Sequence, residues 1–381
     1  MARESKQPLL TVQDLRVEFR TRRGAAMVLN GVDFQLRGGE TLCVVGESGC
    51  GKSMTALALL RLIPSPPGRI VGGRVDFQGE DLVRASEARM REVRGDRISM
   101  IFQEPMTSLN PVFTVGDQIG ETLRLHAKLD TRAARERSIE MLRSVGIPAP
   151  ERRVDEYPHQ LSGGMRQRVM IAMALACRPD VLIADEPTTA LDVTVQAQIF
   201  DLLRALQAER GTAILLITHD MGAVAEMADR VMVMYAGRVI EQGSVEQVLR
   251  APSHPYTQGL IECLPELGSS QIDEAAELAE ISGVVPSLWE LGQGCAFRER
   301  CAYADDACLP NSTLRDRLAG LGWTCGGSAV FTNHPTCTNP CVIARAVSRN
   351  SGTVEASQFA KSAMKSSNAC RSSQAHRVSP F

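Results

Sequence analysis

The sequence predicts an α/β fold organised around a phosphate-binding loop, and three features indicate this. The stretch Gly46–Ser53 reads GESGCGKS and matches the pattern G-x-x-x-x-G-K-S. An apolar, strand-like segment, Thr41–Val45, precedes it, and a helix-prone segment, Met54–Leu62, follows it. Further apolar strands end in polar residues, which is where α/β proteins bind ligands. The length of 381 residues allows roughly two to three domains.

The predicted loop has the chemistry of a polyphosphate site. Backbone N–H groups and the positive end of the following helix dipole attract phosphate, and glycines allow a close approach. Lys52 is expected to reach the β- and γ-phosphates, and Ser53 to hold Mg²⁺. The nucleotide contacts expected here are Gly46, Glu47, Ser48, Gly49, Cys50, Gly51, Lys52, Ser53 and Met54.

Two strands are expected before the loop. Leu10–Phe19 alternates apolar and polar residues with one slip in the period, and Val28–Leu36 is a second strand region. Small β-elements of this kind can form a side wall for a nucleotide base. Phe19 is the candidate aromatic for stacking on adenine, and an ordinary core position is an equally open interpretation.

After the loop, Gly72–Phe77 and Arg97–Phe102 are predicted strands. The second leads to Gln103, whose amide can reach Mg²⁺ or an attacking water, although a solvated loop residue is the alternative. Prolines and an Asn make the following stretch an irregular loop. From Val115 to about Ile147 the apolar residues recur at helical spacing.

A second anion-binding helix end is predicted at Leu161–Arg168. Ser162 can cap the helix, and Gly163 and Gly164 leave backbone N–H groups open at its N-terminus. The helix continues with Met, Ile and Ala residues.

Two carboxylates end the apolar strand that follows this helix. In Val181–Pro187, Asp185 is expected to complete the Mg²⁺ shell, and Glu186 to polarise the attacking water. Asp192 then precedes a helix that reaches about Arg210.

One more apolar strand, Ala213–Thr218, ends at His219. A lone His is more often structural. This one falls at the end of a strand, where it can contact a γ-phosphate.

Composition excludes some classes of protein. The formal net charge is −2 and aromatic residues make up 4% of the chain, which disfavours a nucleic-acid partner. No apolar run approaches the roughly 18 residues of a membrane-spanning helix. The N-terminal residues lack the apolar core of a signal peptide, so we expect a cytosolic protein that can still sit on a membrane protein.

Together, these motifs resemble the nucleotide-binding subunits of ABC transporters over residues 9 to about 250. The matching parts are the phosphate loop, the Gln loop at Gln103, the signature Leu161–Gln167, the strand carboxylates, the Asp loop Ala190–Asp192 and the His switch His219. His254–Thr257, Gly294–Ala304 and Phe102–Pro111 also resemble the dipeptide and oligopeptide importer subgroup.

The resemblance implies an ABC-type P-loop ATPase fold with a β-subdomain. The ATPase domain spans 1–252, with an inserted helical subdomain at about 104–178. A small cysteine-rich extension is expected at 253–345. The Ser-, Ala- and Arg-rich composition of the last residues, without a periodic apolar pattern, predicts a disordered tail at 346–381.

In this family two subunits enclose ATP between the phosphate loop of one and the signature of the other. The resemblance implies that the catalytic residues are Lys52, Gln103, Glu186 and His219. Mg²⁺ is held by Ser53, Gln103 and Asp185. The further contacts to ATP are Ser162, Gly163 and Gly164 from the signature and Asp192 from the Asp loop.

The resemblance further implies an ATP-hydrolysing, energy-coupling subunit of a membrane importer for di- or oligopeptides. Its partners are two transmembrane permeases, a second ATPase subunit, identical or different, and a separate solute-binding protein. Its place is the cytoplasmic face of the inner membrane, as a peripheral subunit. Import of another solute such as nickel is the first alternative. A soluble ABC ATPase acting on ribosomes or DNA is the second.

Cysteines are concentrated near the C-terminus, where seven of the eleven lie between Cys295 and Cys370. Related importer subunits carry four cysteines suited to a four-iron, four-sulfur cluster, which here correspond to Cys295, Cys301, Cys308 and Cys325. Zinc and a set of free thiols are the alternatives. Cys337 and Cys341 compete with Cys325 for the fourth position.

Overall fold

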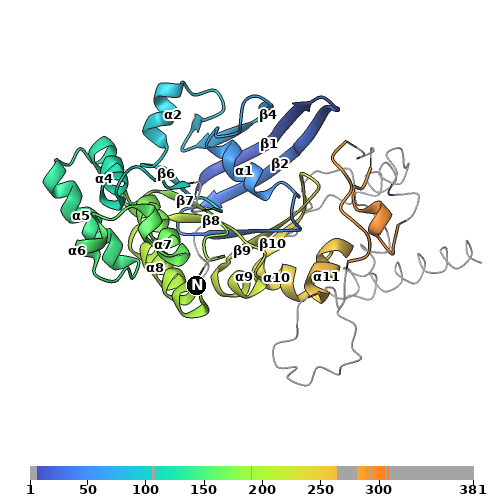
Figure 1. Ribbon diagram of the computed structural model, residues 1–381. Helices are drawn as coiled ribbons and strands as arrows, with labels where there is room; N and C mark the ends of the chain where they lie inside the picture. The colour runs from blue at the N-terminus through green and yellow to red at the C-terminus, as the bar shows by residue number, and fades with distance from the viewer. Residues whose placement is uncertain are drawn as a thin grey trace, which may run out of the picture. The chain divides into compact units, whose positions relative to one another are not determined.

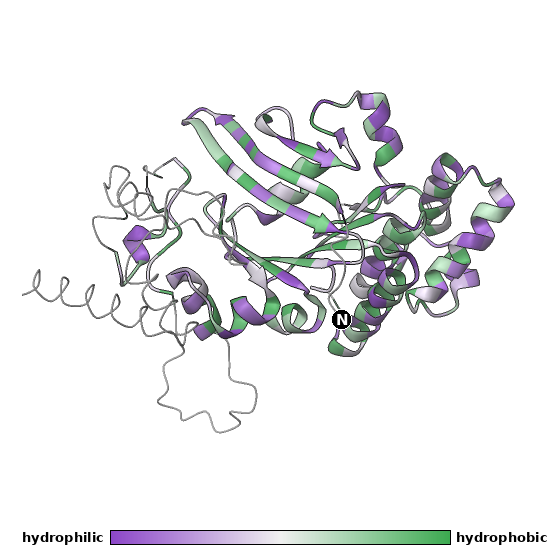
Figure 2. Ribbon diagram, turned by 180° about the vertical axis from the view of Figure 1, so that it is seen from behind, coloured by the Kyte–Doolittle hydropathy of each residue, from purple (hydrophilic) through white to green (hydrophobic). Residues whose placement is uncertain are grey.

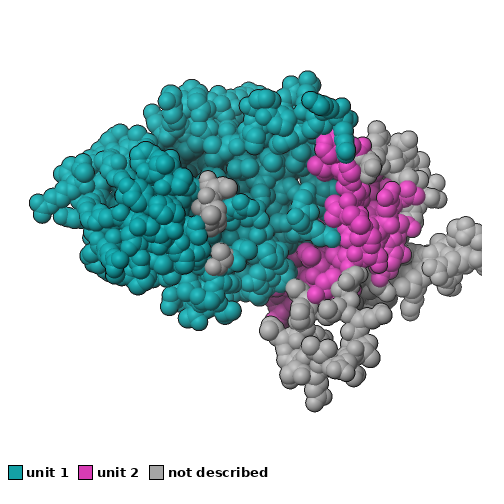
Figure 3. Space-filling view, viewed as in Figure 1, with its two compact units in different colours: residues 1–239 teal, residues 240–381 magenta. Residues whose placement is uncertain are grey.

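The computed structural model describes residues 7–104, 108–189, 191–263, 281–289, 291, 294–304 and 308 (Figure 1). Contacts along the chain divide it into two compact units, Met1–Val239 and Ile240–Phe381, which Figure 3 shows in separate colours. The first unit holds the predicted nucleotide motifs, and the second holds the described cysteines of the extension.

A six-stranded sheet forms the centre of the fold, in the order β10-β9-β3-β8-β7-β6. Its strands are β3 (Thr41–Val45), β6 (Ile98–Ile101), β7 (Val181–Asp185), β8 (Ala213–Ile217), β9 (Arg230–Tyr235) and β10 (Arg238–Ser244). Every residue of β3, β7 and β8 is buried, as expected for parallel strands covered on both faces. The strands predicted at these positions are confirmed, and Figure 2 shows the central strands as hydrophobic runs.

A second, antiparallel sheet has the order β2-β1-β4-β5. It consists of β1 (Pro8–Thr21), β2 (Gly24–Arg37), β4 (Gly68–Phe77) and β5 (Glu80–Asp81), and its long strands alternate in hydropathy (Figure 2). The slip in the period of β1 is a register shift between Val12 and Leu15, where Asp14 has a φ of 46°. The bulge returns Leu15 and Val17 to the buried face, so one core joins the two sheets.

The helices of the first unit cover the central sheet and form the helical insert. Among the described residues they include α1 (Lys52–Leu59), α2 (Glu87–Val93), α4 (Val115–His126), α5 (Thr131–Ser144), α6 (Pro150–Arg153), α7 (Gly163–Leu175), α8 (Val193–Arg210) and α9 (Met221–Met227). Figure 1 shows α4, α5 and α6 grouped beside α7, and α4 and α5 both pack on α7.

The helical pattern expected from Val115 to about Ile147 is divided into two helices. Lys128 lies between α4 and α5 with a left-handed φ of 55°. Asp130 then caps α5, because its side chain accepts a hydrogen bond from the N–H of Ala133 at 2.8 Å. Periodicity alone does not register such a break, since the apolar residues of both helices face the same packing partner.

The second unit contains α10 (Val245–Arg250), α11 (Pro255–Glu262) and a short 3₁₀ turn at Arg298–Arg300. Its core includes the buried rings of Tyr256 and Phe297, which meet edge to face with centroids 5.4 Å apart. Glu241 fixes the start of α11, because its carboxylate accepts hydrogen bonds from the N–H groups of Ser253 and His254 at 2.7 and 3.0 Å.

The turn after β9 supports the phosphate loop. The N–H of Gly237 donates to the carbonyl of Cys50 at 2.9 Å, and the carbonyl of Gly237 accepts from Asn30 at 2.9 Å. Gly237 has a φ of +75°, and a Cβ there would lie 2.3 Å from the carbonyl oxygen of Val28. Only glycine therefore fits between the β2 backbone and the loop.

Gly237→Ala should destabilise the first unit more than Gly211→Ala. Gly211 has a φ of +71° but open space around its Cβ position, so it carries the backbone strain without the clash. We expect the Gly211 variant to lose about 1 kcal/mol of unfolding free energy, and the Gly237 variant about 1–3 kcal/mol more. Urea unfolding of both variants measures the difference, and equal losses would contradict the close approach at Gly237.

Candidate nucleotide site

Four neighbouring strand ends bring the predicted site residues to one edge of the central sheet. β3 pairs in parallel with β8, β8 with β7, and β7 with β6. The phosphate loop follows β3, His219 follows β8, Glu186 follows β7 and Gln103 follows β6. Because the carboxyl ends of parallel strands meet at the same edge, this order alone assembles the site (Figure 1).

The phosphate loop is a tight backbone structure with a buried lysine at its centre. The Nζ of Lys52 donates to the carbonyls of Gly46 and Glu47 at 2.6 and 3.0 Å, and the residue is 8% exposed. A Cβ at Gly46 would lie 2.3 Å from the carbonyl oxygen of Met234. Gly51 begins α1 with no side-chain cap, so the first N–H groups of the helix have no capping side chain and suit an anion.

The two predicted Mg²⁺ ligands from separate elements lie in contact. The hydroxyl of Ser53 hydrogen-bonds to the carboxylate of Asp185, which is 2% exposed. Burial is the main cause that raises the pKa of Asp185, and the negative charge of Glu186 raises it further. The hydrogen bond from Ser53 and the positive charge of Lys52 act in the opposite direction. The Oδ1 atom of Asp185 is buried with no hydrogen-bond partner. A hydroxyl and an orphaned carboxylate oxygen are hard oxygen donors, so these residues fit Mg²⁺.

Glu186 is held from both sides at the end of β7. One carboxylate oxygen, Oε1, lies 3.2 Å from Nδ1 of His219. The hydroxyl of Thr189 donates to the other, Oε2, at 3.3 Å, and to the Glu186 carbonyl at 3.2 Å. The φ of Glu186 is +48°, a left-handed conformation that a non-glycine residue adopts only when its surroundings impose it.

The sequence analysis did not predict a role for Thr189. The feature that could have indicated its contact with Glu186 is a hydroxyl three residues after a strand-end carboxylate, within a turn that contains Pro187. That spacing allows a side chain to hydrogen-bond back onto the turn.

The other predicted contacts of the first unit occupy more open positions. Gln103 is exposed after β6. Phe19 is half-buried near the end of β1, packs on the core cluster, and would lie 2.8 Å from a Cβ at Gly68. This packing accounts for Phe19 as a core residue, and its stacking on adenine stays a prediction. Met54 is half-buried on α1 against the same core.

The signature and the Asp loop each begin a helix with a polar cap. Ser162 is exposed and accepts a hydrogen bond from the N–H of Met165 at 3.3 Å, which starts α7 at Gly163. A Cβ at Gly163 would meet open space, so the glycine leaves this helix end accessible. Asp192 is exposed and caps α8 by accepting from Val195 at 3.0 Å.

The predicted cysteine ligands are described only in part. Cys295 and Cys301 are half-buried and Cys308 is buried, and the N–H of Cys295 donates to the carbonyl of Cys308 at 3.1 Å. Within the described ranges, no group of three or more His, Cys, Asp or Glu residues is placed to hold a metal ion. Cys325, Cys337, Cys341 and the predicted tail 346–381 lie outside the described residues.

Comparison with known proteins agrees with this geometry. Residues 29–189 match the family model described as ABC transporter, and residues 240–308 match the one described as oligopeptide/dipeptide transporter, C-terminal region. A dimeric ATP-binding cassette solved in a post-hydrolysis state with ADP and phosphate superposes with a TM-score of 0.57 at 27% identity, covering 62% of this chain and 98% of that one.

Curated relatives match over most of their length. A probable peptide ABC transporter ATP-binding protein of Sinorhizobium fredii is 54% identical over 79% of this chain and 89% of its own. The oligopeptide transport ATP-binding protein OppD of Bacillus subtilis is 53% identical over 78% of this chain and 82% of its own. The chain therefore belongs to the ATP-binding proteins of ABC transporters, a family that hydrolyses ATP to power transport.

None of the helices in the described ranges is long and apolar enough to cross a lipid bilayer.

Asp185→Asn should separate stability from magnesium binding. The raised pKa of Asp185 means that its charge opposes folding at neutral pH in the nucleotide-free protein, so the neutral amide should keep or raise the melting temperature. Mg-ATP should bind at least about ten-fold more weakly, a loss of about 1.4 kcal/mol. Melting curves with and without Mg-ATP measure both effects, and an unchanged Mg-dependent shift would exclude Asp185 as a ligand.

Proposed function

We propose that this chain is the ATP-hydrolysing motor subunit of an importer for dipeptides or oligopeptides. The observation that carries the proposal is the pairing of an assembled ATPase edge in the first unit with a match to the oligopeptide/dipeptide transporter C-terminal region at 240–308. The curated relatives named as peptide transport ATP-binding proteins support the cargo class.

The site residues divide the chemistry among themselves. The loop N–H groups and Lys52 bind the phosphates, and Ser53 and Asp185 hold Mg²⁺, which neutralises phosphate charge when bound. Glu186 accepts hydrogen bonds through both carboxylate oxygens, which orients it to take a proton from the attacking water. His219 is 66% exposed in its side chain, so it faces the solvent side where the γ-phosphate would lie.

Two copies of the ATPase core, identical or different, are needed for a complete site in this proposal. The phosphate loop offers one anion-binding helix end at α1, and the signature offers another at α7. A solved relative is a dimer bound to ADP and phosphate, which supports an arrangement in which ATP joins these two ends across subunits. Hydrolysis then removes the charge that holds the dimer closed.

Glu186→Gln is the direct test of the catalytic assignment. The amide keeps the size of the side chain but cannot accept the proton, so ATP should still bind while hydrolysis falls at least about a hundred-fold. Phosphate release measures the rate, and size-exclusion chromatography with ATP measures the trapped dimer. Near-normal hydrolysis would show that another group is the base.

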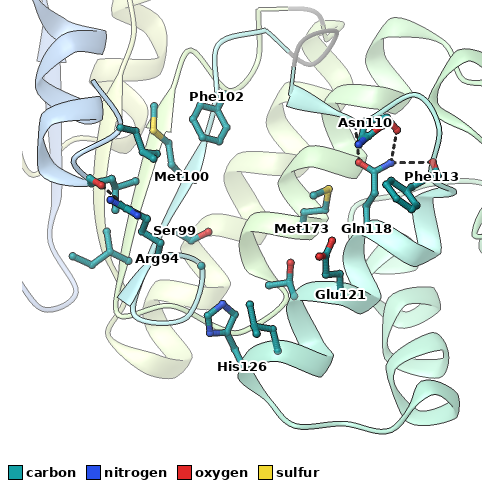
Figure 4. A pocket seen from close by; sticks show the side chains of 16 residues that line it. Arg94, Ser99, Met100, Phe102, Asn110, Phe113, Gln118, Glu121, His126 and Met173 are labelled. Carbon is teal, nitrogen blue, oxygen red and sulfur yellow. Dashed lines mark hydrogen bonds between the residues drawn. The ribbon is translucent and has the colours of Figure 1, made fainter. Parts of the chain in front are cut away.

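A groove beside β6 supports docking of a membrane partner. A pocket of about 530 Å³ lies between β6 and the helical insert, apart from the phosphate loop (Figure 4). Its apolar walls include Leu62, Met100, Phe102, Phe113, Leu125 and Met173. Phe113 and Leu125 are 52% and 58% exposed. Exposing such large apolar side chains to water is unfavourable, which is typical of a surface that binds a partner.

Gln118 holds the groove wall in place. Its side chain is buried and hydrogen-bonds both the N–H and the carbonyl of Asn110, at 2.9 and 3.0 Å, and the carbonyl of Phe113 at 3.1 Å. Figure 4 shows these three bonds beside the Phe113 ring. A preformed apolar groove of this kind suits a short amphipathic helix, so we assign it to a cytoplasmic helix of a permease.

Phe113→Asp should uncouple the chain from its membrane partners. A charge in the groove opposes the burial of an apolar helix face, so a tagged variant should recover at least about ten-fold less permease from membranes while binding ATP normally. Val71→Asp is the matched control, because Val71 is 40% exposed on β4 outside the groove.

Mass spectrometry of the proteins that co-purify with the wild-type chain decides the wider assignment. Two permeases and a second ATPase would support the importer and its peripheral place on the cytoplasmic face of the inner membrane. A nickel-specific or other binding protein in the same complex would change the cargo. Ribosomes or DNA-repair factors without membrane proteins would contradict the transport function.

The iron–sulfur cluster stays a prediction within this function. A backbone hydrogen bond from the N–H of Cys295 to the carbonyl of Cys308, two of the four expected ligands, supports their proximity in the second unit. The remaining geometry depends on Cys325, which the described residues do not include.

A further inference from the structure

Gln167 is a buried polar residue of the signature helix that the mechanism above does not use. It lies five residues after Ser162 on α7 and is 1% exposed. Its Nε2 donates a hydrogen bond of 2.8 Å to the carbonyl of Pro187. The bond spans 20 residues of sequence and joins the signature helix to the turn after β7.

The acceptor of this bond follows the proposed base directly. Glu186 has its left-handed φ of +48°, and its carbonyl accepts from Thr189, so residues 186–189 form one compact turn. Pro187 is buried and its ring restricts the turn further. A displacement of the Pro187 carbonyl therefore moves the backbone that sets the Glu186 side chain.

The next residue of α7 ties the helix to the helical insert. Nη1 of Arg168 donates to the carbonyl of Gly146, just after α5, at 2.5 Å. Burial lowers the pKa of Arg168, and the negative charge of Asp192 opposes that effect, which places the Asp loop within electrostatic reach. Two consecutive side chains thus attach α7 to the catalytic turn on one side and to the insert on the other.

We propose that Gln167 is a positioning residue that couples the two ATP sites of the dimer. This inference rests on the proposed function, in which the N-terminus of α7 faces ATP bound by the partner while Glu186 faces ATP bound by its own subunit. When α7 engages the partner's ATP, the buried Gln167–Pro187 hydrogen bond carries its displacement to Glu186. Each site then hydrolyses ATP only when the other is occupied.

The bond suits this role because it has no ready substitute. A buried amide that loses its hydrogen-bond partner has no water to bind instead, so breaking this bond costs free energy. Movement of α7 together with the turn at 186–189 avoids that cost. A side chain that only filled space would not need an amide here, and an apolar residue of the same length would serve equally well.

The test is the ATP dependence of hydrolysis by the full-length chain in its purified complex. Gln167→Met keeps the length of the side chain and removes the donor. We expect the Hill coefficient to fall from near two toward one and kcat to fall about ten-fold. The half-saturating concentration of a non-hydrolysable Mg-ATP analogue should stay within about two-fold.

Gln207→Met is the matched control. Gln207 also donates a partly buried amide hydrogen bond, of 3.0 Å to the hydroxyl of Thr41, but at the opposite edge of the central sheet. This variant should lose comparable thermal stability and keep both the Hill coefficient and kcat.

Gln167→Glu adds a readout that a packing role would not change. A buried carboxyl group has a raised pKa and, when protonated, can donate to the Pro187 carbonyl. The Hill coefficient of this variant, relative to that of the wild type, should therefore recover as the pH falls. If Gln167→Met does not fold, Gln167→Glu still tests the coupling role.

The outcomes separate the two proposals. Cooperative hydrolysis by both Gln167 variants at every pH, or hydrolysis by the wild type with a Hill coefficient of one, would overturn the coupling role and leave the ATPase assignment intact. No hydrolysis by the wild-type complex would overturn the proposed function itself.

Discussion

The parallel, in-register pairing of β3, β8 and β7 is the constraint on which the rest of the structure depends. Asp185 pairs with Ile217, so the chain leaves β7 and β8 at the same level, and the proposed base meets His219 across a gap of 3.2 Å. The same pairing places the phosphate loop after β3 next to these strand ends. A slip of one residue would turn Asp185 to the other face of the sheet and break its hydrogen bond with Ser53.

Several features of the candidate site raise the free energy of the folded protein, and burial of the surrounding core offsets this cost. Glu186 adopts a left-handed backbone, and Asp185 is a buried carboxylate with one orphaned oxygen. Lys52 is a buried cation held by two loop carbonyls and a weak contact with the sulfur of Cys50. Each costs of order 1–3 kcal/mol without ligand. The residues of β3, β7 and β8 are all buried, and the hydrophobic effect of this burial offsets the cost. In the proposed site, Mg²⁺ and phosphate would complement these charges, so the strain would prepare the site for binding.

β6 links the candidate nucleotide site to the groove that we propose as a docking site. Phe102, which follows the strand, lines the groove, and Gln103, the next residue, begins the loop toward the nucleotide edge. α7 makes a second link, because Met173 near its end lines the groove while Ser162 caps its exposed N-terminus. In the proposed function, a partner seated in the groove would therefore touch the same elements that present the signature and the Gln loop. Under that proposal, the arrangement would give a physical route from the nucleotide state to the membrane partner with few intervening contacts.

The sequence by itself determined the elements and residue types of the site. The phosphate loop, the capped signature helix, the strand carboxylates and the buried strands are short-range patterns, because turn chemistry, capping and hydrophobic periodicity act over a few residues. Only the tertiary structure decided which side chains meet. The Ser53–Asp185, Glu186–His219 and Gln167–Pro187 contacts each join separate elements, and the division of the helical insert at Lys128 and the groove beside β6 also depend on packing. Such contacts are set by how strands pair and helices pack across the core, and no local pattern in the chain encodes them.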